Sequence, residues 1–186
     1  MLYILTALKC EASALRELPG EVIVTGAGRR AFDRISKLEL IPDDRVLNAG
    51  ICAGAEKGKL YLVNQVISSE TGKRYYPDIL FESGLPEMPL TTSGEVVTDV
   101  EDGMLYDMEA VLICEKVLKI RPPSNLVICK VVSDSGSGFP SANEVTELIR
   151  SHLDEIKMIT GHLSAGEKDL SYEFLPESME IGRAHV

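Results

Sequence analysis

The chain has 186 residues, of which 45% are hydrophobic and 26% charged, and its formal net charge is -10. These values fit an ordinary globular protein, and we expect a single domain over residues 1–186. The negative charge repels polyanions, and the sequence has no stripe of Lys and Arg that would offset it, so a nucleic-acid partner is not expected.

The apolar runs, such as 60–63 and 126–129, have the length of a strand and are too short to span a membrane. The sequence after Met1 lacks the basic segment of a secretory signal and soon becomes polar. We therefore expect a cytoplasmic protein without membrane contact.

The first part of the chain alternates strand-like and helix-like segments. The predicted strands are 2–6, 21–25, 45–49 and 60–68. The predicted helices are 11–18 and 29–38. Small-residue turns at 26–28 and 50–54 directly follow two of the strands, as in a βαβ arrangement.

The second part contains the most apolar segment. Residues 69–89 mix Gly, Pro, Tyr and charges without a steady period, which predicts a loop with a short strand near 79–81. A helix over 107–119 ends before Pro122, and the apolar run 126–132 predicts a central strand covered on both faces. The last predicted helix runs from 141 to about 159.

Ser141 and Glu144 form a capping box at the start of that last helix. The alternation of strands and helices predicts an α/β fold with three layers, α/β/α, around a mixed, mostly parallel sheet. Ligands of such sheets usually bind at the carboxyl ends of strands, which here lie near Glu11, Gly26, Gly50 and Asp134.

The histidines and cysteines do not suggest a catalytic or metal site. All three histidines, His152, His162 and His185, fall on or after the last helix, away from those strand ends. The cysteines have no CxxC spacing and are expected to be reduced; they are Cys10, Cys52, Cys114 and Cys129. We expect no metal and no organic cofactor, and catalysis by carboxylates.

The segment 26–31 fits the pattern G-x-G-x-x-A of a dinucleotide-binding loop. That site also needs an acidic residue at the end of the next strand, and 45–50 has none. A tight turn is the preferred interpretation of this segment.

A sharper set of motifs lies at the predicted strand ends and helix starts. In chain order the motifs are 7–11 (ALKCE), 48–54 (NAGICAG), 93–95 (SGE), 107–109 (DME) and 131–134 (VVSD). Their order resembles the nucleoside phosphorylase/nucleosidase superfamily, and the 5'-methylthioadenosine/S-adenosylhomocysteine nucleosidases are the most similar branch. The resemblance covers nearly the whole chain and implies a phosphorylase/hydrolase-like fold.

The resemblance implies a role for each residue. Asp134 would protonate N7 of the leaving purine and Ser133 would orient it, while Glu109 would hold the ribose hydroxyls with Met108 against the sugar. Glu11 would activate the attacking water. Such a reaction needs an acid and a base, so we expect a raised pKa for Asp134 at the end of a buried strand and a better solvated or hydrogen-bonded Glu11. Taken alone, Asp134 could also be a turn residue, and Glu11 could also be a surface charge on the first helix.

Some positions depart from the family pattern. The chain is short between the first helix and Val22, so edge strands of the family are expected to be missing. Val97 stands where many of these nucleosidases have a Phe that stacks on adenine, and Ile51 replaces a hydroxyl residue. Positions 48 and 49 lack the arginine that a phosphorylase would use for phosphate, and Arg29 with Arg30 is interpreted as a solvated pair.

The leading hypothesis is hydrolysis of the N-glycosidic bond of a purine nucleoside. The alternatives are a phosphate-dependent phosphorylase and a non-catalytic nucleoside-binding protein. The expected partner is a small nucleoside. Residues 69–89 would contact its 5' substituent, with a partner subunit as a further candidate for that contact, and the family precedent implies a homodimer.

Overall fold

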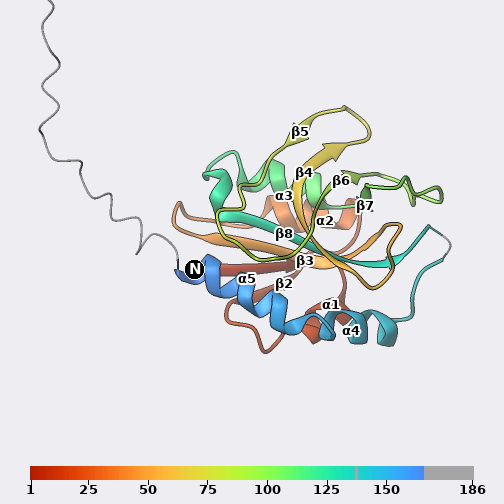
Figure 1. The fold of residues 1–186 in the computed structure, drawn as a ribbon. Coiled ribbons are helices and arrows are strands. Elements are labelled where there is room, and N and C mark those ends of the chain that lie inside the picture. The colour runs from red at the N-terminus through yellow and green to blue at the C-terminus, as the bar shows by residue number, and fades with distance from the viewer. Residues whose placement is uncertain (137, 166–186) are drawn as a thin grey trace, which may run out of the picture.

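The computed structural model describes residues 1–136 and 138–165, and these form one mixed sheet flanked by helices (Figure 1). The strands are β1 (Leu2–Thr6), β2 (Glu21–Val24), β3 (Arg45–Ala53), β4 (Leu60–Ser68), β5 (Arg74–Tyr75), β6 (Glu87–Thr92), β7 (Leu105–Asp107) and β8 (Leu126–Asp134). The helices are α1 (Lys9–Ala14), α2 (Arg29–Ser36), α3 (Ala110–Val117), the 3₁₀ turn η1 (Pro123–Asn125), α4 (Ala142–Arg150) and α5 (Leu153–Ala165).

The sheet is mixed, as predicted. β1 lies between β2 and β3 and is parallel to both, and β8 runs parallel to β3 and antiparallel to β4. β6 is parallel to both β4 and β7, while β7 and β5 pair antiparallel with β3 and β4. Every residue of β8 before Asp134 is buried, which confirms the central position predicted for this strand.

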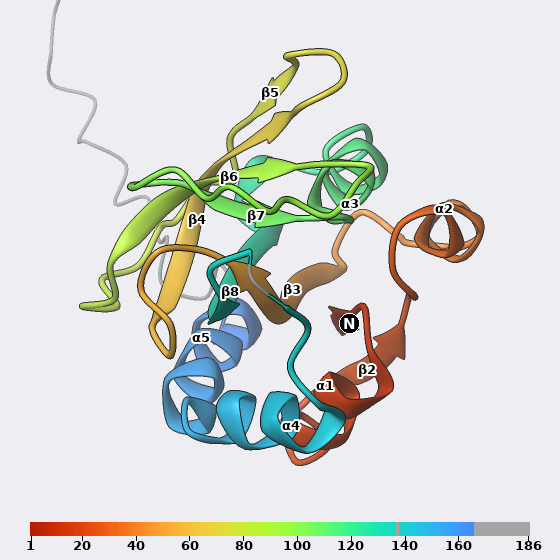
Figure 2. The same cartoon turned by 90° about the vertical axis from the view of Figure 1, so that its right-hand side faces the viewer.

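Helices cover both faces of the sheet (Figure 2). α2 and α3 contribute to one core cluster, and α1, α4 and α5 contribute to another on the opposite face. Ser141 Oγ accepts a hydrogen bond from the Glu144 amide, and the Glu144 carboxylate accepts one from the Ser141 amide, so the predicted capping box at the start of α4 is confirmed.

The expected turn at 50–54 is wrong, because β3 continues to Ala53 in parallel pairing with β8. The predicted helix over 107–119 is also shorter: its first residues form β7 beside β6, and α3 begins at Ala110. In both places a long-range strand pairing, which local sequence does not encode, decides the local conformation.

Three further segments differ from expectation. The first helix spans Lys9–Ala14 instead of 11–18, and the long last helix is two helices, α4 and α5. No strand forms at 79–81, whereas β5 and the start of β6 fall within 69–89. The terminal segment 181–186, including His185, lies outside the described residues.

Among the described helices, none is long and apolar enough to cross a bilayer. The four cysteines are free, and Cys52, Cys114 and Cys129 are buried.

Candidate active site

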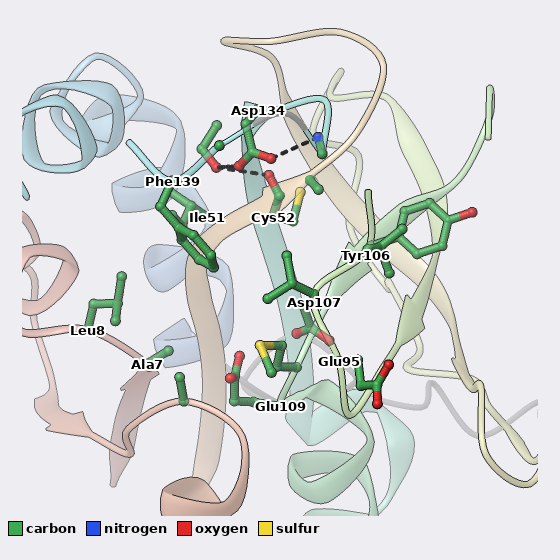
Figure 3. Close-up of a pocket in the computed structure, with 18 of the residues that line it drawn as sticks. Ala7, Leu8, Ile51, Cys52, Glu95, Tyr106, Asp107, Glu109, Asp134 and Phe139 are labelled. Atoms are coloured by element: carbon green, nitrogen blue, oxygen red, sulfur yellow. Dashed lines mark hydrogen bonds between the residues drawn. The ribbon is translucent and has the colours of Figure 1, made fainter. Parts of the chain in front are cut away.

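A cavity opens at the carboxyl ends of β1, β3 and β8 (Figure 3). The seven site residues predicted from the sequence all line it, and they are Glu11, Ile51, Val97, Met108, Glu109, Ser133 and Asp134. These residues come from five separate segments of the chain, so the fold brings the predicted set together at one place.

Glu11 lies in the first turn of α1 and is 1% exposed. Its two carboxylate oxygens accept hydrogen bonds from the backbone amides of Leu8 (2.7 Å) and Ile51 (2.8 Å). Gly50 makes this approach possible, because a Cβ at that position would lie 2.6 Å from Glu11 Oε1. Burial raises the pKa of Glu11, and the Ile51 amide and the Lys130 charge oppose that rise.

Asp134 ends β8, and the protein orients both of its carboxylate oxygens. Ser133 Oγ donates to Asp134 Oδ2 at 2.7 Å and lies 3.2 Å from the Cys52 carbonyl oxygen. The Gly136 amide donates to Asp134 Oδ1 at 2.9 Å. Gly136 has a φ of 86° and packs against the backbone of Thr98, which fixes the turn that holds this amide in place.

Glu109 is the N-cap residue of α3 and lines the same cavity, 6% exposed. Its Oε1 accepts a hydrogen bond from the Gly28 amide at 2.9 Å. Gly28 has a φ of 55°, so the glycine-rich segment 26–28 is the tight turn predicted from the sequence. This turn presents the Gly28 amide to the Glu109 carboxylate. Burial, together with the nearby Asp107 charge, raises the pKa of Glu109 to about 7.

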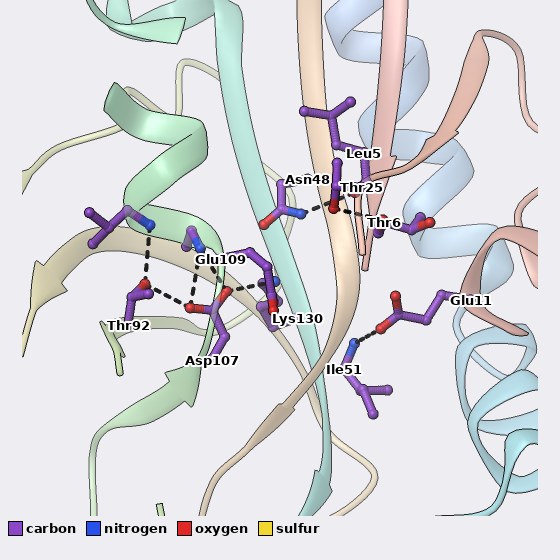
Figure 4. A network of polar contacts seen from close by, with 12 residues as sticks. Leu5, Thr6, Glu11, Thr25, Asn48, Ile51, Thr92, Asp107, Glu109 and Lys130 are labelled. Atoms are coloured by element: carbon purple, nitrogen blue, oxygen red, sulfur yellow. Dashed lines mark hydrogen bonds and ion pairs between the residues drawn. The ribbon is translucent and has the colours of Figure 1, made fainter. Parts of the chain in front are cut away.

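Lys130 is a site component that the sequence reasoning missed (Figure 4). Its side chain is 3% exposed, and its Nζ lies 2.9 Å from Asp107 Oδ2. Asp107 also accepts a hydrogen bond from Thr92 Oγ1 at 2.7 Å and one from the Ala110 amide at the start of α3. The available signal was a lysine within the most apolar strand, because such a charge needs a buried partner.

The charge of Lys130 acts beyond its own ion pair. Burial opposes the charged form of Lys130, but the carboxylates of Asp107 and Glu109 outweigh this effect and raise its pKa above the usual range. In return Lys130 limits the rise in the pKa values of Glu109 and Glu11. One buried cation thus balances three buried carboxylates.

Phe139 also lines the cavity and was not predicted. Its ring is 77% exposed and lies beside Ile51 in Figure 3. Val97 lines the cavity too, without an aromatic ring. The sequence signal for Phe139 was a lone aromatic residue in the Ser/Gly-rich turn that follows Asp134.

Of the two alternatives expected for Glu11, better solvated or hydrogen-bonded, the structure shows the second, because its carboxylate accepts two backbone hydrogen bonds while it is 1% exposed. One expectation about the site is wrong. No residue of 69–89 lines the cavity. The reason is that β5 and the loop around it extend along the outer edge of β4.

His152 and His162 lie away from the cavity, as expected. The imidazole Nε2 of His152 is 2.8 Å from the Gly58 carbonyl oxygen, and the ring of His162 stacks on Phe81 at 4.6 Å. Over residues 1–136 and 138–165, no group of three or more His, Cys, Asp and Glu side chains is placed to hold a metal ion.

Solved structures with the same fold come from several organisms. The nucleosidase MTAN (5'-methylthioadenosine/S-adenosylhomocysteine nucleosidase) of Chlamydia trachomatis, solved with 5'-methylthioadenosine (MTA) bound, is 20% identical. Its TM-score is 0.72 over 87% of this chain and 98% of that one. The 5'-methylthioadenosine nucleosidase of Arabidopsis thaliana is 19% identical, with a TM-score of 0.62 over 88% of this chain and 94% of that one.

A third example is the 5'-methylthioadenosine/S-adenosylhomocysteine nucleosidase of Helicobacter pylori, which is 13% identical, with a TM-score of 0.68 over 87% of this chain and 98% of that one. No protein-family profile matches the chain, and no curated protein sequence matches it. The comparisons therefore show the fold of this chain, at low sequence identity.

Proposed function

We propose that this chain is a nucleosidase that hydrolyses the N-glycosidic bond of a purine nucleoside of the 5'-methylthioadenosine or S-adenosylhomocysteine type. The observation that carries the proposal is the convergence of Glu11, Glu109 and the Ser133–Asp134 pair on one cavity. The fold shared with nucleosidases supports the same assignment, including one solved with MTA bound.

Asp134 is the proposed general acid, and Ser133 lets it hold a proton or release one. The hydroxyl of Ser133 has one proton and two acceptors within reach, Asp134 Oδ2 and the Cys52 carbonyl oxygen. When Asp134 is ionised, Ser133 donates to it. When Asp134 is protonated, the Ser133 hydroxyl can donate to the Cys52 carbonyl oxygen and accept a hydrogen bond from the carboxylic acid of Asp134. Asp134 can then give its proton to N7 of the departing base.

Glu109 is the proposed ribose anchor. Its Oε1 is held by the Gly28 amide, and no other described residue donates to its carboxylate. The free acceptor capacity suits the two vicinal hydroxyls of a ribose, and Met108 lines the cavity next to it. Binding requires the ionised form of Glu109, because a carboxylate accepts two hydrogen bonds and a carboxylic acid also presents a donor.

Glu11 is the proposed base for the attacking water. Two backbone amides hold its carboxylate and favour the ionised form, although burial opposes it. The transition state is an oxocarbenium-like sugar, which needs an acid at the leaving group and a base at the nucleophile. The chemistry proposed needs no metal and no organic cofactor.

Hydrolysis is proposed over phosphorolysis, since no arginine occupies positions 48 and 49 in β3. We further propose a shortened, three-layer α/β/α architecture of the phosphorylase/hydrolase type, formed by residues 1–186 as a single domain. A cytoplasmic homodimer that acts on a small nucleoside, without nucleic acid or membrane partners, completes the proposal.

The test incubates the protein with a small panel of purine nucleosides, with and without phosphate, and measures the release of free base by chromatography. We expect release from 5'-methylthioadenosine without phosphate, and loss of release in Asp134→Asn, which keeps the shape and removes the acid. Full activity of Asp134→Asn would overturn the mechanism. Turnover only with phosphate would make the protein a phosphorylase, and nucleoside binding without release would make it a binding protein.

A further inference from the structure

A second hollow adjoins the cavity and is lined by basic side chains. Ala7, Leu8 and Ala27 line both the cavity and this hollow, so the two share a wall. The rest of its lining is formed by Lys9, Val24, Thr25, Gly26, Arg30 and Arg34. We call it the cationic hollow.

The cationic hollow concentrates positive charge on a protein whose net charge is -10. Lys9, Arg30 and Arg34 are its only charged lining residues, and none of the three has an ion-pair partner within the described part of the chain. Arg34 Nη1 donates to the Val24 carbonyl oxygen at 2.7 Å, which holds this guanidinium at the hollow. Its other N–H groups remain available to an anion.

We propose that the cationic hollow binds a phosphate group carried on the 5' end of the nucleoside. This inference rests on the proposed function and adds a substrate class to it. A guanidinium pairs well with a phosphate, and three cations at one concave place attract such a dianion in spite of the overall negative charge.

The layout of the cavity directs the 5' end toward this hollow. With the base at Asp134 and the ribose diol at Glu109, the wall that Ala7 and Leu8 form is the one that the cavity shares with the cationic hollow. Figure 3 shows this wall on the opposite side of the cavity from Glu95 and Tyr106. Residues 69–89, the segment expected to contact the 5' substituent, do not reach the cavity.

The test compares two substrates that differ at the 5' position, 5'-methylthioadenosine and adenosine 5'-monophosphate. The measured quantity is the ratio of their kcat/KM values at low ionic strength. In the double variant Lys9→Glu/Arg30→Glu we expect kcat/KM for adenosine 5'-monophosphate, divided by kcat/KM for 5'-methylthioadenosine, to fall by about tenfold or more.

The matched control is Arg16→Glu/Lys37→Glu, which makes the same change in net charge at exposed positions outside the hollow. An equal fall in this control would overturn the proposal, because the general field of the protein would then explain the effect. Stimulation of base release by inorganic phosphate that depends on Lys9 and Arg30 would also overturn it, because the anion would be a co-substrate.

Failure of the proposed function is a separate result. If the unaltered protein releases base from neither nucleoside, calorimetry compares adenosine 5'-monophosphate with adenosine as ligands. Tighter binding of the monophosphate that is lost in Lys9→Glu/Arg30→Glu supports the cationic hollow. Equal affinities for the two ligands overturn it.

Discussion

The two ends of the central sheet each bury an acidic side chain, and they differ in how many donors the protein supplies to it. At the end where β1, β3 and β8 begin, Asp44 is 2% exposed, and both of its oxygens are engaged. Its Oδ1 accepts from the Met1 ammonium at 2.9 Å and its Oδ2 from the Ile41 amide at 2.7 Å. At the cavity end, Glu109 receives a single hydrogen bond, from Gly28.

The pKa values follow this difference. Burial opposes the charged form of Asp44, but the Ile41 amide and the Met1 ammonium outweigh it and lower its pKa. Burial of Glu109 with too few donors raises its pKa to about 7. Asp44 is thus satisfied within the fold, whereas Glu109 keeps open acceptor positions at a cost in stability, and these are the positions that the proposed ribose would use.

The largest expected effect is that of Glu109→Gln on catalysis. The amide cannot accept hydrogen bonds from both ribose hydroxyls as a carboxylate does, so kcat/KM should fall about a thousandfold, which corresponds to ~4 kcal/mol. Glu147→Gln, an exposed position on α4, is the matched control. Steady-state kinetics on 5'-methylthioadenosine measure both, and equal activities would show that Glu109 does not anchor the ribose.

The same substitution should alter the pH dependence. Because Glu109 has to be ionised and its pKa is about 7, kcat/KM should fall as the pH drops below about 7, and Glu109→Gln should lose that limb of the profile. A raised carboxyl pKa also means that stability is lost as the pH rises from 4.5 to about 7. Chemical denaturation at pH 8 should therefore find Glu109→Gln at least as stable as the unaltered protein.

Asp44→Asn should give the opposite result, with activity retained and stability lowered by about 3 kcal/mol. The reason is Arg121, whose side chain is 0% exposed and lies 3.7 Å from Asp44 Oδ2, and which would lose its counter-charge. Urea denaturation measures the loss, with the exposed neighbour substitution Asp43→Asn as the control. Unchanged stability would remove the contrast between the two ends of the sheet.

The smallest effect is expected from Phe139→Ala. An aromatic ring that stacks on a base contributes about 1–3 kcal/mol, so KM should rise roughly tenfold with little change in stability. Phe32→Ala is the control, since this ring is 59% exposed on α2 and does not line the cavity. An unchanged KM in Phe139→Ala would mean that this ring does not contact the base.

Local pattern was enough to predict the central strand and the capped helix that begins after Ser141. The apolar run of β8 and the capping box at α4 each encode their structure within a few residues. The extension of β3 past Gly50 and the existence of β7 were not predictable in this way, because β3 pairs with β8 and β7 pairs with β3, and these partner strands lie far apart in the chain.

The site divides in the same manner. Glu11, Glu109 and Asp134 follow from motif order, since each sits at a strand end or helix start where a ligand is expected. The balance of protonation does not follow, because it is set by Lys130 and by burial that only the packed structure defines. The hydrogen bonds of Glu11 fit one of the two alternatives expected for it, whereas its nearly complete burial was not predictable from the sequence.

The proposed mechanism is tested most directly by a crystal structure of the Asp134→Asn variant with 5'-methylthioadenosine bound. We expect the side chain at position 134 to lie within about 3.2 Å of the purine N7, and both ribose hydroxyls to donate to Glu109. A base bound away from position 134, or a ribose that does not reach Glu109, would contradict it.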